Sequence, residues 1–266
     1  MKTILQISDP HLMSIADGRL KGVPTAKSLE MVIADARAHH PEADRIVMTG
    51  DLSHEHTQSG YEILASLLSD WTAKAQFLPG NHDDRATLRQ VFATMERDGL
   101  EDIRFREEVD AWLLVGLDSH VPGEVFGRLS DASLKWLESV LNESPTRPTL
   151  IFLHHPPVKV GSQWIDALML QNSADLDRVL SSAPGVRGIF SGHIHQERRA
   201  SLGTIPFYSC PSTAFQFAPA TTTRRFDNRP PGYRVILLGE TGEFQTHVRR
   251  LAHLVFPPTD KTSGTD

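Results

Sequence analysis

The sequence predicts one α/β domain. Short apolar runs of strand length alternate along the chain with longer amphipathic stretches of helical length, which is the pattern of proteins built from both kinds of element. The 266 residues are enough for one large domain with a substantial core. No segment has the composition of an interdomain linker. We therefore expect a single domain over residues 1–256 and a flexible C-terminal tail over 257–266.

The strands are predicted from short apolar runs that are bounded by turn-forming residues. The first such run is Ile4-Leu5-Gln6-Ile7. In chain order, the predicted strands cover 3–8, 44–49, 75–79, 111–117, 148–153 and 186–191. A strand-rich end follows them, at 196–201, 204–209, 232–238 and 243–250.

The helices are predicted from apolar residues at helical spacing, as with Leu29, Val32 and Ala36 in the first of them. Ser130 has the side chain of a residue that caps a helix N-terminus. The predicted helices cover 25–39, 57–71, 84–96, 130–142 and 172–182. By contrast, the proline-containing segment 218–232 is expected to form a long irregular loop.

Composition and charge narrow the functional classes. The chain carries 27 basic and 33 acidic residues, and this net charge of −6 argues against a nucleic-acid partner. No run approaches the ~18 apolar residues of a membrane span, so we expect a cytoplasmic, soluble protein without a membrane partner. The single cysteine, Cys210, excludes both an internal disulfide and a cysteine-based zinc motif. Any metal ion must therefore be held by His, Asp, Asn or Glu.

Ligand-type side chains follow five of the predicted strands. They are Asp9, His11, Asp51, Asn81, His154, His193 and His195. A lone Asp after a strand is most often a turn or cap residue, and a lone His is usually a satisfied core group. Ligands of α/β proteins, however, bind beyond the carboxyl ends of the strands, where these side chains recur. The recurrence favours a metal site.

The spacing and number of these residues indicate the kind of site. His193 and His195 stand two residues apart, so on an extended backbone their rings point to the same face, as do Asp9 and His11. Seven ligands are too many for one tetrahedral ion but suit two five- or six-coordinate ions. Asp51 can bridge such a pair through its two oxygens. Mixed His, Asp and Asn ligation suits Fe, Mn, Zn or Co.

The order of the motifs resembles that of the calcineurin-like metallophosphoesterase superfamily and, within it, of the bacterial class III cyclic-nucleotide phosphodiesterases. The motifs are Asp9-x-His11, Gly50-Asp51, Gly80-Asn81-His82-Asp83, His154 and Gly192-His193-x-His195. The resemblance extends over about residues 3–251. It implies a sandwich of two central mixed β-sheets flanked by helices.

The resemblance also implies how the ligands divide between two divalent or trivalent metal ions. One ion would be held by Asp9, His11, Asp51 and His195. The second would be held by Asp51, Asn81, His154 and His193, with Asp51 as the bridge. His155, the neighbour of a ligand, is expected to point to the opposite side.

The activity implied is that of a phosphodiesterase that opens 3′,5′-cyclic AMP to 5′-AMP by in-line attack of a metal-bridging hydroxide. Asp51 and His82 would be the catalytic residues, with His82 donating a proton to the leaving oxygen. Asn81, His82 and His195 would contact the substrate. A glycerophosphodiesterase or broad phosphodiesterase with the same site remains an alternative. A non-catalytic nucleotide-binding or scaffold module is a remote one.

The chain departs from many relatives at His54, where they carry a carboxylate three residues after the bridging Asp. Glu55 or His56 could supply that outer support. Trp164 and Phe215 could stack on a nucleobase, although aromatic residues more often belong to the core. The protein is expected to act on a small molecule as a monomer or a homodimer.

Overall fold

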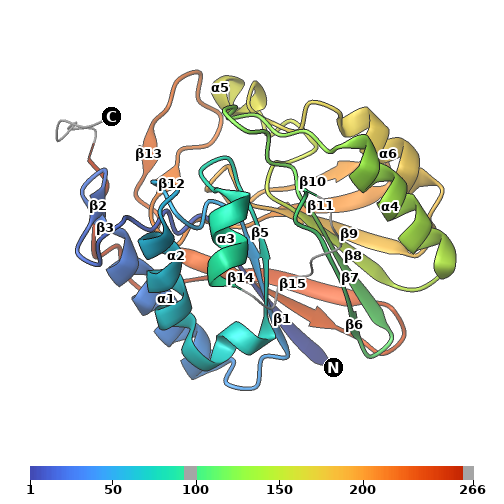
Figure 1. Ribbon diagram of the computed structural model, residues 1–266, viewed down its shortest axis with the longest axis horizontal. Helices are drawn as coiled ribbons and strands as arrows, with labels where there is room; N and C mark the ends of the chain where they lie inside the picture. The colour runs from blue at the N-terminus through green and yellow to red at the C-terminus, as the bar shows by residue number, and fades with distance from the viewer. Residues whose placement is uncertain (93–100, 260–266) are drawn as a thin grey trace.

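The computed structural model describes residues 1–92 and 101–259, and its centre is a pair of β-sheets packed face to face (Figure 1). The first sheet has five strands in the order β15-β14-β1-β4-β5. β1, β4 and β5 are parallel, and β14 and β15 continue the sheet antiparallel. Their bounds are β1 Lys2–Ile7, β4 Arg45–Thr49, β5 Ala75–Leu78, β14 Gly232–Leu238 and β15 Phe244–Arg250.

The second sheet has six strands in the order β10-β11-β9-β8-β7-β6. The four inner strands run parallel, and the two edge strands β6 and β10 are antiparallel to their neighbours. The bounds are β6 Phe105–Val109, β7 Trp112–Leu117, β8 Thr149–Leu153, β9 Val186–Ser191, β10 Arg199–Leu202 and β11 Ile205–Ser209. Both sheets are therefore mixed, as the resemblance implied.

Helices cover the outer face of each sheet, which gives four layers in the order α/β/β/α (Figure 1). Buried residues of α1 and α2 pack on the first sheet, and those of α4 and α6 pack on the second. The helices are α1 Thr25–His39, α2 Gln58–Leu68, α3 Arg85–Val91, α4 Asp131–Glu143, α5 Gln163–Asp166 and α6 Ser173–Ser181. The predicted cap is present, because the Ser130 side chain accepts a hydrogen bond from Ser133 N.

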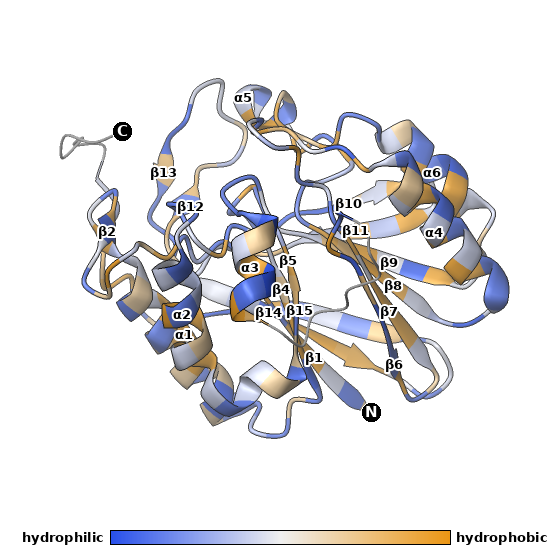
Figure 2. Ribbon diagram, in the orientation of Figure 1, coloured by the Kyte–Doolittle hydropathy of each residue, from blue (hydrophilic) through white to orange (hydrophobic). Residues whose placement is uncertain are grey.

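Among the residues that the structure describes, the buried apolar cluster between the two sheets consists of strand residues. Ile4 and Val47 of the first sheet belong to the same buried cluster as Phe152 and Phe190 of the second. The neighbouring residue Leu5 points to the other face, against the helices. Because the central strands are buried on both faces, they are continuous apolar runs (Figure 2). This is why they could be found in the sequence.

Several elements differ from the prediction. β6 was missed because its sequence, FREEV, carries three charged residues. The predicted helix 57–71 is α2 followed by a 3₁₀ helix, Ser69–Lys74, and the backbone breaks at Ser69, which has a φ of 52°. The segment 218–232 is not wholly irregular, because two short strands pair within and beside it, β12 Gln216–Phe217 and β13 Phe226–Asp227.

Other short elements were not predicted. They are α5 and a small hairpin of β2 Arg19–Leu20 and β3 Val23–Pro24. Residues 93–96 of the predicted helix 84–96, and 260–266 of the predicted tail, lie outside the described residues. Within the tail's described part, Thr259 N donates a hydrogen bond to Lys21 O of the hairpin, at 2.9 Å.

No helix among the described residues combines the length and the apolar character that a membrane crossing needs. The expected cellular location stays a prediction.

Candidate metal centre

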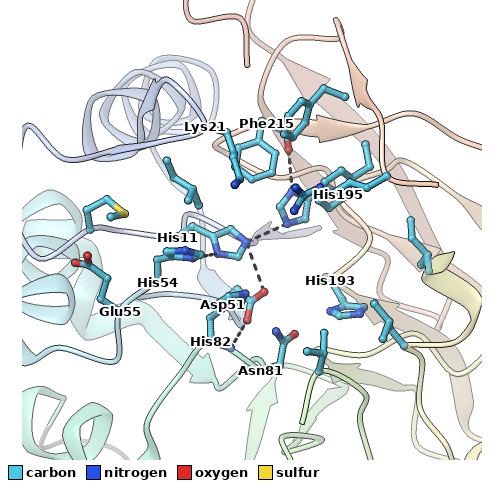
Figure 3. Close-up of a pocket in the computed structure, with 18 of the residues that line it drawn as sticks. His11, Lys21, Asp51, His54, Glu55, Asn81, His82, His193, His195 and Phe215 are labelled. Carbon is cyan, nitrogen blue, oxygen red and sulfur yellow. Dashed lines mark hydrogen bonds and ion pairs between the residues drawn. The ribbon is translucent and has the colours of Figure 1, made fainter. Parts of the chain in front are cut away.

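The seven predicted ligands lie just beyond the carboxyl ends of five strands. Three of these strands, β1, β4 and β5, belong to the first sheet, and two, β8 and β9, belong to the second. Because the sheets pack face to face with these strand ends at one edge, residues that are far apart in the sequence meet there (Figures 1 and 3).

A first group of ligand atoms gathers around His11. Its Nε2 atom lies 3.1 Å from Nε2 of His195 and 3.5 Å from Oδ2 of Asp51. Oδ1 of Asp9 lies 3.4 Å from Nε2 of His195. All four side chains are buried, and their ligand atoms are within 4.8 Å of one another. This group has the four members that the resemblance assigned to one ion.

A second group gathers around His154. Its Nε2 atom lies 3.4 Å from Oδ2 of Asp51 and 3.2 Å from Nδ1 of His193. The same oxygen of Asp51 therefore faces both His11 and His154. A carboxylate in this position is shared by the two groups.

Hydrogen bonds to backbone carbonyls fix which nitrogen of two rings faces the centre. Nδ1 of His154 donates to Thr49 O at 2.7 Å, and Nδ1 of His195 donates to Phe215 O at 2.8 Å. In both rings Nε2 is therefore the nitrogen that points toward the centre and can bind a metal ion. Metal-ligating histidines are held in this way in metalloproteins.

The electrostatics of the centre favour a positive charge. Burial lowers the pKa of His154, but the neighbouring Asp51 carboxylate raises it overall, to about 9. Burial by itself would raise the pKa of Asp51, yet His154 and His11 hold it well below its usual range. Burial lowers the pKa of His193 to about 3, which keeps this ring neutral and able to bind a metal ion.

The side chain of Asn81 shows whether the centre suits a metal ion. Its side-chain oxygen is buried and has no hydrogen-bond partner among the described residues, while the residue lines the pocket of the centre. A buried polar atom without a partner costs free energy unless a ligand satisfies it. Together with the imidazole and carboxylate atoms nearby, this amide oxygen fits a metal ion of mixed N and O ligation.

The backbone of the centre is not extended, contrary to the prediction. His193 and His195 have φ values of 69° and 48°, and Asp9, His11 and Asp51 have φ values of 53°, 47° and 51°. Residues other than glycine rarely adopt this left-handed conformation, and it is found where function requires it. The sharp turns send His193 and His195 to different groups rather than to one face.

Close packing explains why a glycine, Gly80, precedes Asn81 in its motif. A Cβ atom at Gly80 would overlap the Asp51 carboxylate and come within 2.7 Å of the ring of His154. Only glycine allows this backbone to pass so near the shared carboxylate.

His155 does not point to the opposite side as expected. β8 ends at Leu153, so strand alternation no longer governs the next two residues, and the His155 ring packs 4.6 Å from that of His193. Its Nε2 atom donates to Val125 O at 3.1 Å, and Ser119 Oγ lies 2.9 Å from Nδ1. Since both ring nitrogens have partners, His155 supports the His193 ring.

His82 and His54 lie next to the first group and line the pocket (Figure 3). The two rings stack with centroids 4.5 Å apart, and the His82 ring lies edge-on to that of His11 at 5.0 Å. The backbone N–H of His82 donates to Oδ1 of Asp51 at 2.9 Å, which fixes its position over the centre. Burial lowers the pKa of His54 to about 4.

The loop after Asp51 is supported by a residue to which no role was assigned. Asp83 is buried and accepts hydrogen bonds from the backbone N–H groups of Leu52, Ser53 and Gly80. It thereby ties the loop that follows β4 to the loop that follows β5. The signal in the sequence was its place in the motif that contains Asn81.

Neither of the two residues proposed for that support takes this position. Glu55 lies at the pocket wall, and its carboxylate accepts a hydrogen bond from Ser14 N at 2.7 Å. His56 is exposed and does not line the pocket.

A pocket of about 690 Å³ opens over the centre (Figure 3). Trp164 and Phe215, the two aromatic residues predicted to stack on a base, both line it. The sequence did not single out Phe217 and Phe226, which come from the hairpin of β12 and β13, or Lys21 at the tip of the hairpin of β2 and β3. The loops 12–24 and 211–231, which contain these residues, were expected to shape the pocket, but which of their side chains reach it depends on the tertiary fold.

A sandwich of two mixed sheets with an Asp and His cluster at its strand ends defines the metallophosphoesterase class. The chain belongs to the calcineurin-like phosphoesterase family, whose model matches residues 2–197. It is an enzyme of the hydrolase class.

Full-length relatives are similar to this chain. A 3′,5′-cyclic adenosine monophosphate phosphodiesterase CpdA of Vibrio vulnificus is 36% identical, over 98% of this chain and 94% of the relative. A 3′,5′-cyclic-nucleotide phosphodiesterase of Nostoc sp. is also 36% identical, over 97% and 96%. Among solved structures, a dimetal phosphatase from Danio rerio superposes with a TM-score of 0.71 at 16% identity, over 94% of this chain and 96% of that one, which shows the shared fold.

Proposed function

We propose that the protein hydrolyses 3′,5′-cyclic AMP to 5′-AMP. The observation that carries the proposal is the Asp51 carboxylate, which faces His11 in one group of ligand side chains and His154 in the other. The substrate is inferred from the similarity of nearly the whole chain to cyclic AMP phosphodiesterases.

The side chains fit two metal ions, one at each group. Asp9, His11, Asp51 and His195 would hold the first, and Asp51, Asn81, His154 and His193 the second. A bound pair of Fe, Mn, Zn or Co ions supplies an activated water and neutralises the charge on the phosphoryl oxygens.

The chain's own residues position the phosphodiester and supply a proton. Water attacks phosphorus, the bond from phosphorus to the 3′ oxygen breaks, and the leaving oxygen takes up a proton. We assign that proton to His82, because its ring lies in the pocket beside the first group and its backbone is held to Asp51. Asn81 and His195, which also line the pocket, would contact the phosphate.

The residues of the centre support hydrolysis of a phosphodiester, but they do not select which alcohol leaves. A glycerophosphodiesterase, or a phosphodiesterase of broad specificity, could use the same residues. The aromatic residues Trp164, Phe217 and Phe226 favour a nucleotide, because an aromatic wall can stack on a base.

A substrate panel tests the proposal. Protein reconstituted with Mn, Fe or Zn is assayed for kcat/KM with cyclic AMP, a glycerophosphodiester and bis(p-nitrophenyl) phosphate, and bound metal is measured alongside. We expect about two ions per chain and the highest kcat/KM with cyclic AMP. Full activity in metal-depleted protein, or a clear preference for the glycerophosphodiester, would contradict the proposal.

A further inference from the structure

His54 contacts two residues of the proposed machinery at once. Its Nδ1 atom lies 3.3 Å from Nδ1 of His11, and its ring stacks on that of His82 at an interplanar angle of 25°. The backbone of His54 is also fixed, because its N–H donates to Leu12 O at 2.9 Å. The residue is half-buried in the pocket wall, where its ring contacts those of His11 and His82 (Figure 3).

The contact between His54 and His11 determines which nitrogen of His11 carries a proton. The two facing nitrogens, Nδ1 of His11 and Nδ1 of His54, are assigned to no metal ion, so at 3.3 Å they need one proton between them, carried by one ring and accepted by the other. The other nitrogen of His11, Nε2, faces His195 and Asp51 at the centre. For Nε2 to keep its lone pair for a metal ion, Nδ1 of His11 must carry the proton and His54 must accept it.

This arrangement sets His11 apart from His154 and His195. Those two rings donate from Nδ1 to backbone carbonyl oxygens, which no substitution of a side chain removes directly. The corresponding partner of His11 is the side chain of His54. The tautomer of one proposed metal ligand thus depends on a residue that is not itself a ligand.

We propose that His54 is a positioning residue with two separable roles, in which its Nδ1 atom fixes the tautomer of His11 and its ring face orients His82. The proposal rests on the proposed function for the role of His82, whereas the role toward His11 requires only that the centre binds metal.

Two substitutions separate the roles. His54→Asn keeps an acceptor, because Oδ1 of Asn is bonded to Cγ as Nδ1 of His is, but it removes the ring. His54→Phe keeps a ring that can stack on His82 but removes the acceptor. The matched controls are His253→Asn and His253→Phe, since His253 is exposed and does not line the pocket.

The first measurement is metal affinity, by competition with a chelator, on protein without substrate. His54→Phe should bind one of the two ions about 10- to 100-fold more weakly, and His54→Asn should bind both as the unsubstituted protein does. Equal affinities for His54→Phe and the unsubstituted protein would overturn the role toward His11. Thermal unfolding of the metal-free variants shows whether a loss of affinity reflects a loss of folding, and equal losses of affinity and Tm in both variants would also overturn it.

The second measurement is kcat for cyclic AMP at saturating metal. His54→Asn should lower kcat while its metal content stays at the unsubstituted level, and His54→Phe should recover most of kcat once metal is in excess. An unchanged kcat in His54→Asn would overturn the role toward His82. If the unsubstituted protein does not hydrolyse cyclic AMP, the proposed function fails, and the metal affinities still decide the role toward His11.

Discussion

His193 and His195 stand two residues apart in one turn, yet they face different partners. Nδ1 of His193 lies 3.2 Å from Nε2 of His154, and Nε2 of His195 lies 3.1 Å from Nε2 of His11. Both residues have a left-handed backbone, which is what sends the neighbouring rings apart. The two histidines therefore make the two groups of the centre separable by experiment.

Replacing either histidine by alanine should reduce the bound metal from about two ions to about one, measured by elemental analysis after dialysis. The ion that remains in each variant is then expected at the group that does not contain the replaced histidine. His195→Ala combined with Asp9→Asn should lose no further ion, because both residues belong to one group. His195→Ala combined with His154→Ala should lose both ions. Complete metal loss in each single variant would contradict the division into two groups.

His82→Ala should lower kcat for cyclic AMP by about 10²- to 10⁴-fold, because a positioned proton donor contributes about that much. Metal content should not change, since the side chain of His82 belongs to neither proposed ligand set. With bis(p-nitrophenyl) phosphate the loss should be much smaller, because p-nitrophenolate leaves without needing a proton. Loss of metal, or equal losses of kcat with both substrates, would exclude the assigned role.

The strands and the convergence of their ends could be predicted because they depend on local sequence. A strand buried on both faces must be an apolar run, and a run such as Leu150-Ile151-Phe152-Leu153 has no other simple interpretation. The missed strand β6, by contrast, lies at the edge of its sheet and carries charged residues. Edge strands need fewer apolar residues, so hydropathy alone does not detect them.

The local geometry of the centre could not be predicted for a different reason. Asp and His adopt a positive φ more readily than most residues other than glycine, but residue type alone does not decide it, and tertiary packing imposes it at Asp9 and His195. The same holds for His155, whose direction follows from its bonds to Val125 and Ser119. The pocket walls also depend on packing, since Lys21, Trp164 and Phe226 come from three separate short elements.

Arg85 and Asp118 form a buried ion pair that joins α3 to the end of β7. Nε and Nη2 of Arg85 lie 2.7 and 3.2 Å from the carboxylate oxygens, and the Asp118 side chain is 0% exposed. Arg85→Met should lower the free energy of unfolding by about 3–5 kcal/mol, because it leaves a buried charge without its partner. Urea unfolding of metal-free protein measures this loss.

The exposed pair of Arg106 and Glu143, with N and O atoms 2.7 Å apart, is the control for that prediction. Arg106→Met should cost only about 0–1 kcal/mol. If the two substitutions cost the same, burial does not determine the contribution of the Arg85 pair.

Asp35 links α1 to the last two strands. Although burial raises the pKa of Asp35, hydrogen bonds from Arg249 and Tyr233 outweigh it and hold the pKa below the usual value of 3.8. A carboxylate whose pKa is lower in the folded state stabilises the fold above its unfolded pKa and loses this contribution as the pH falls. The stability difference between the unsubstituted protein and Asp35→Asn should therefore be constant near neutral pH and shrink below about pH 4. Chemical unfolding of both metal-free proteins at a series of pH values checks this, and a difference that grows as the pH falls would contradict it.

Trp164 lies in α5 at the pocket wall, where its Nε1 atom donates to Thr221 Oγ1 at 3.2 Å and its ring meets Phe217 edge-on with centroids 5.0 Å apart. If the base of the substrate stacks on this ring, Trp164→Ala should lower kcat/KM for cyclic AMP by about 5- to 150-fold, since stacking contributes about 1–3 kcal/mol per base. Trp164→Phe keeps a stacking surface and should recover most of the loss, and a pyrimidine cyclic nucleotide, with its smaller ring, should be affected less than cyclic AMP. Equal losses in the Ala and Phe variants would mean that the indole acts through its hydrogen bond to Thr221, which Thr221→Val would then reproduce.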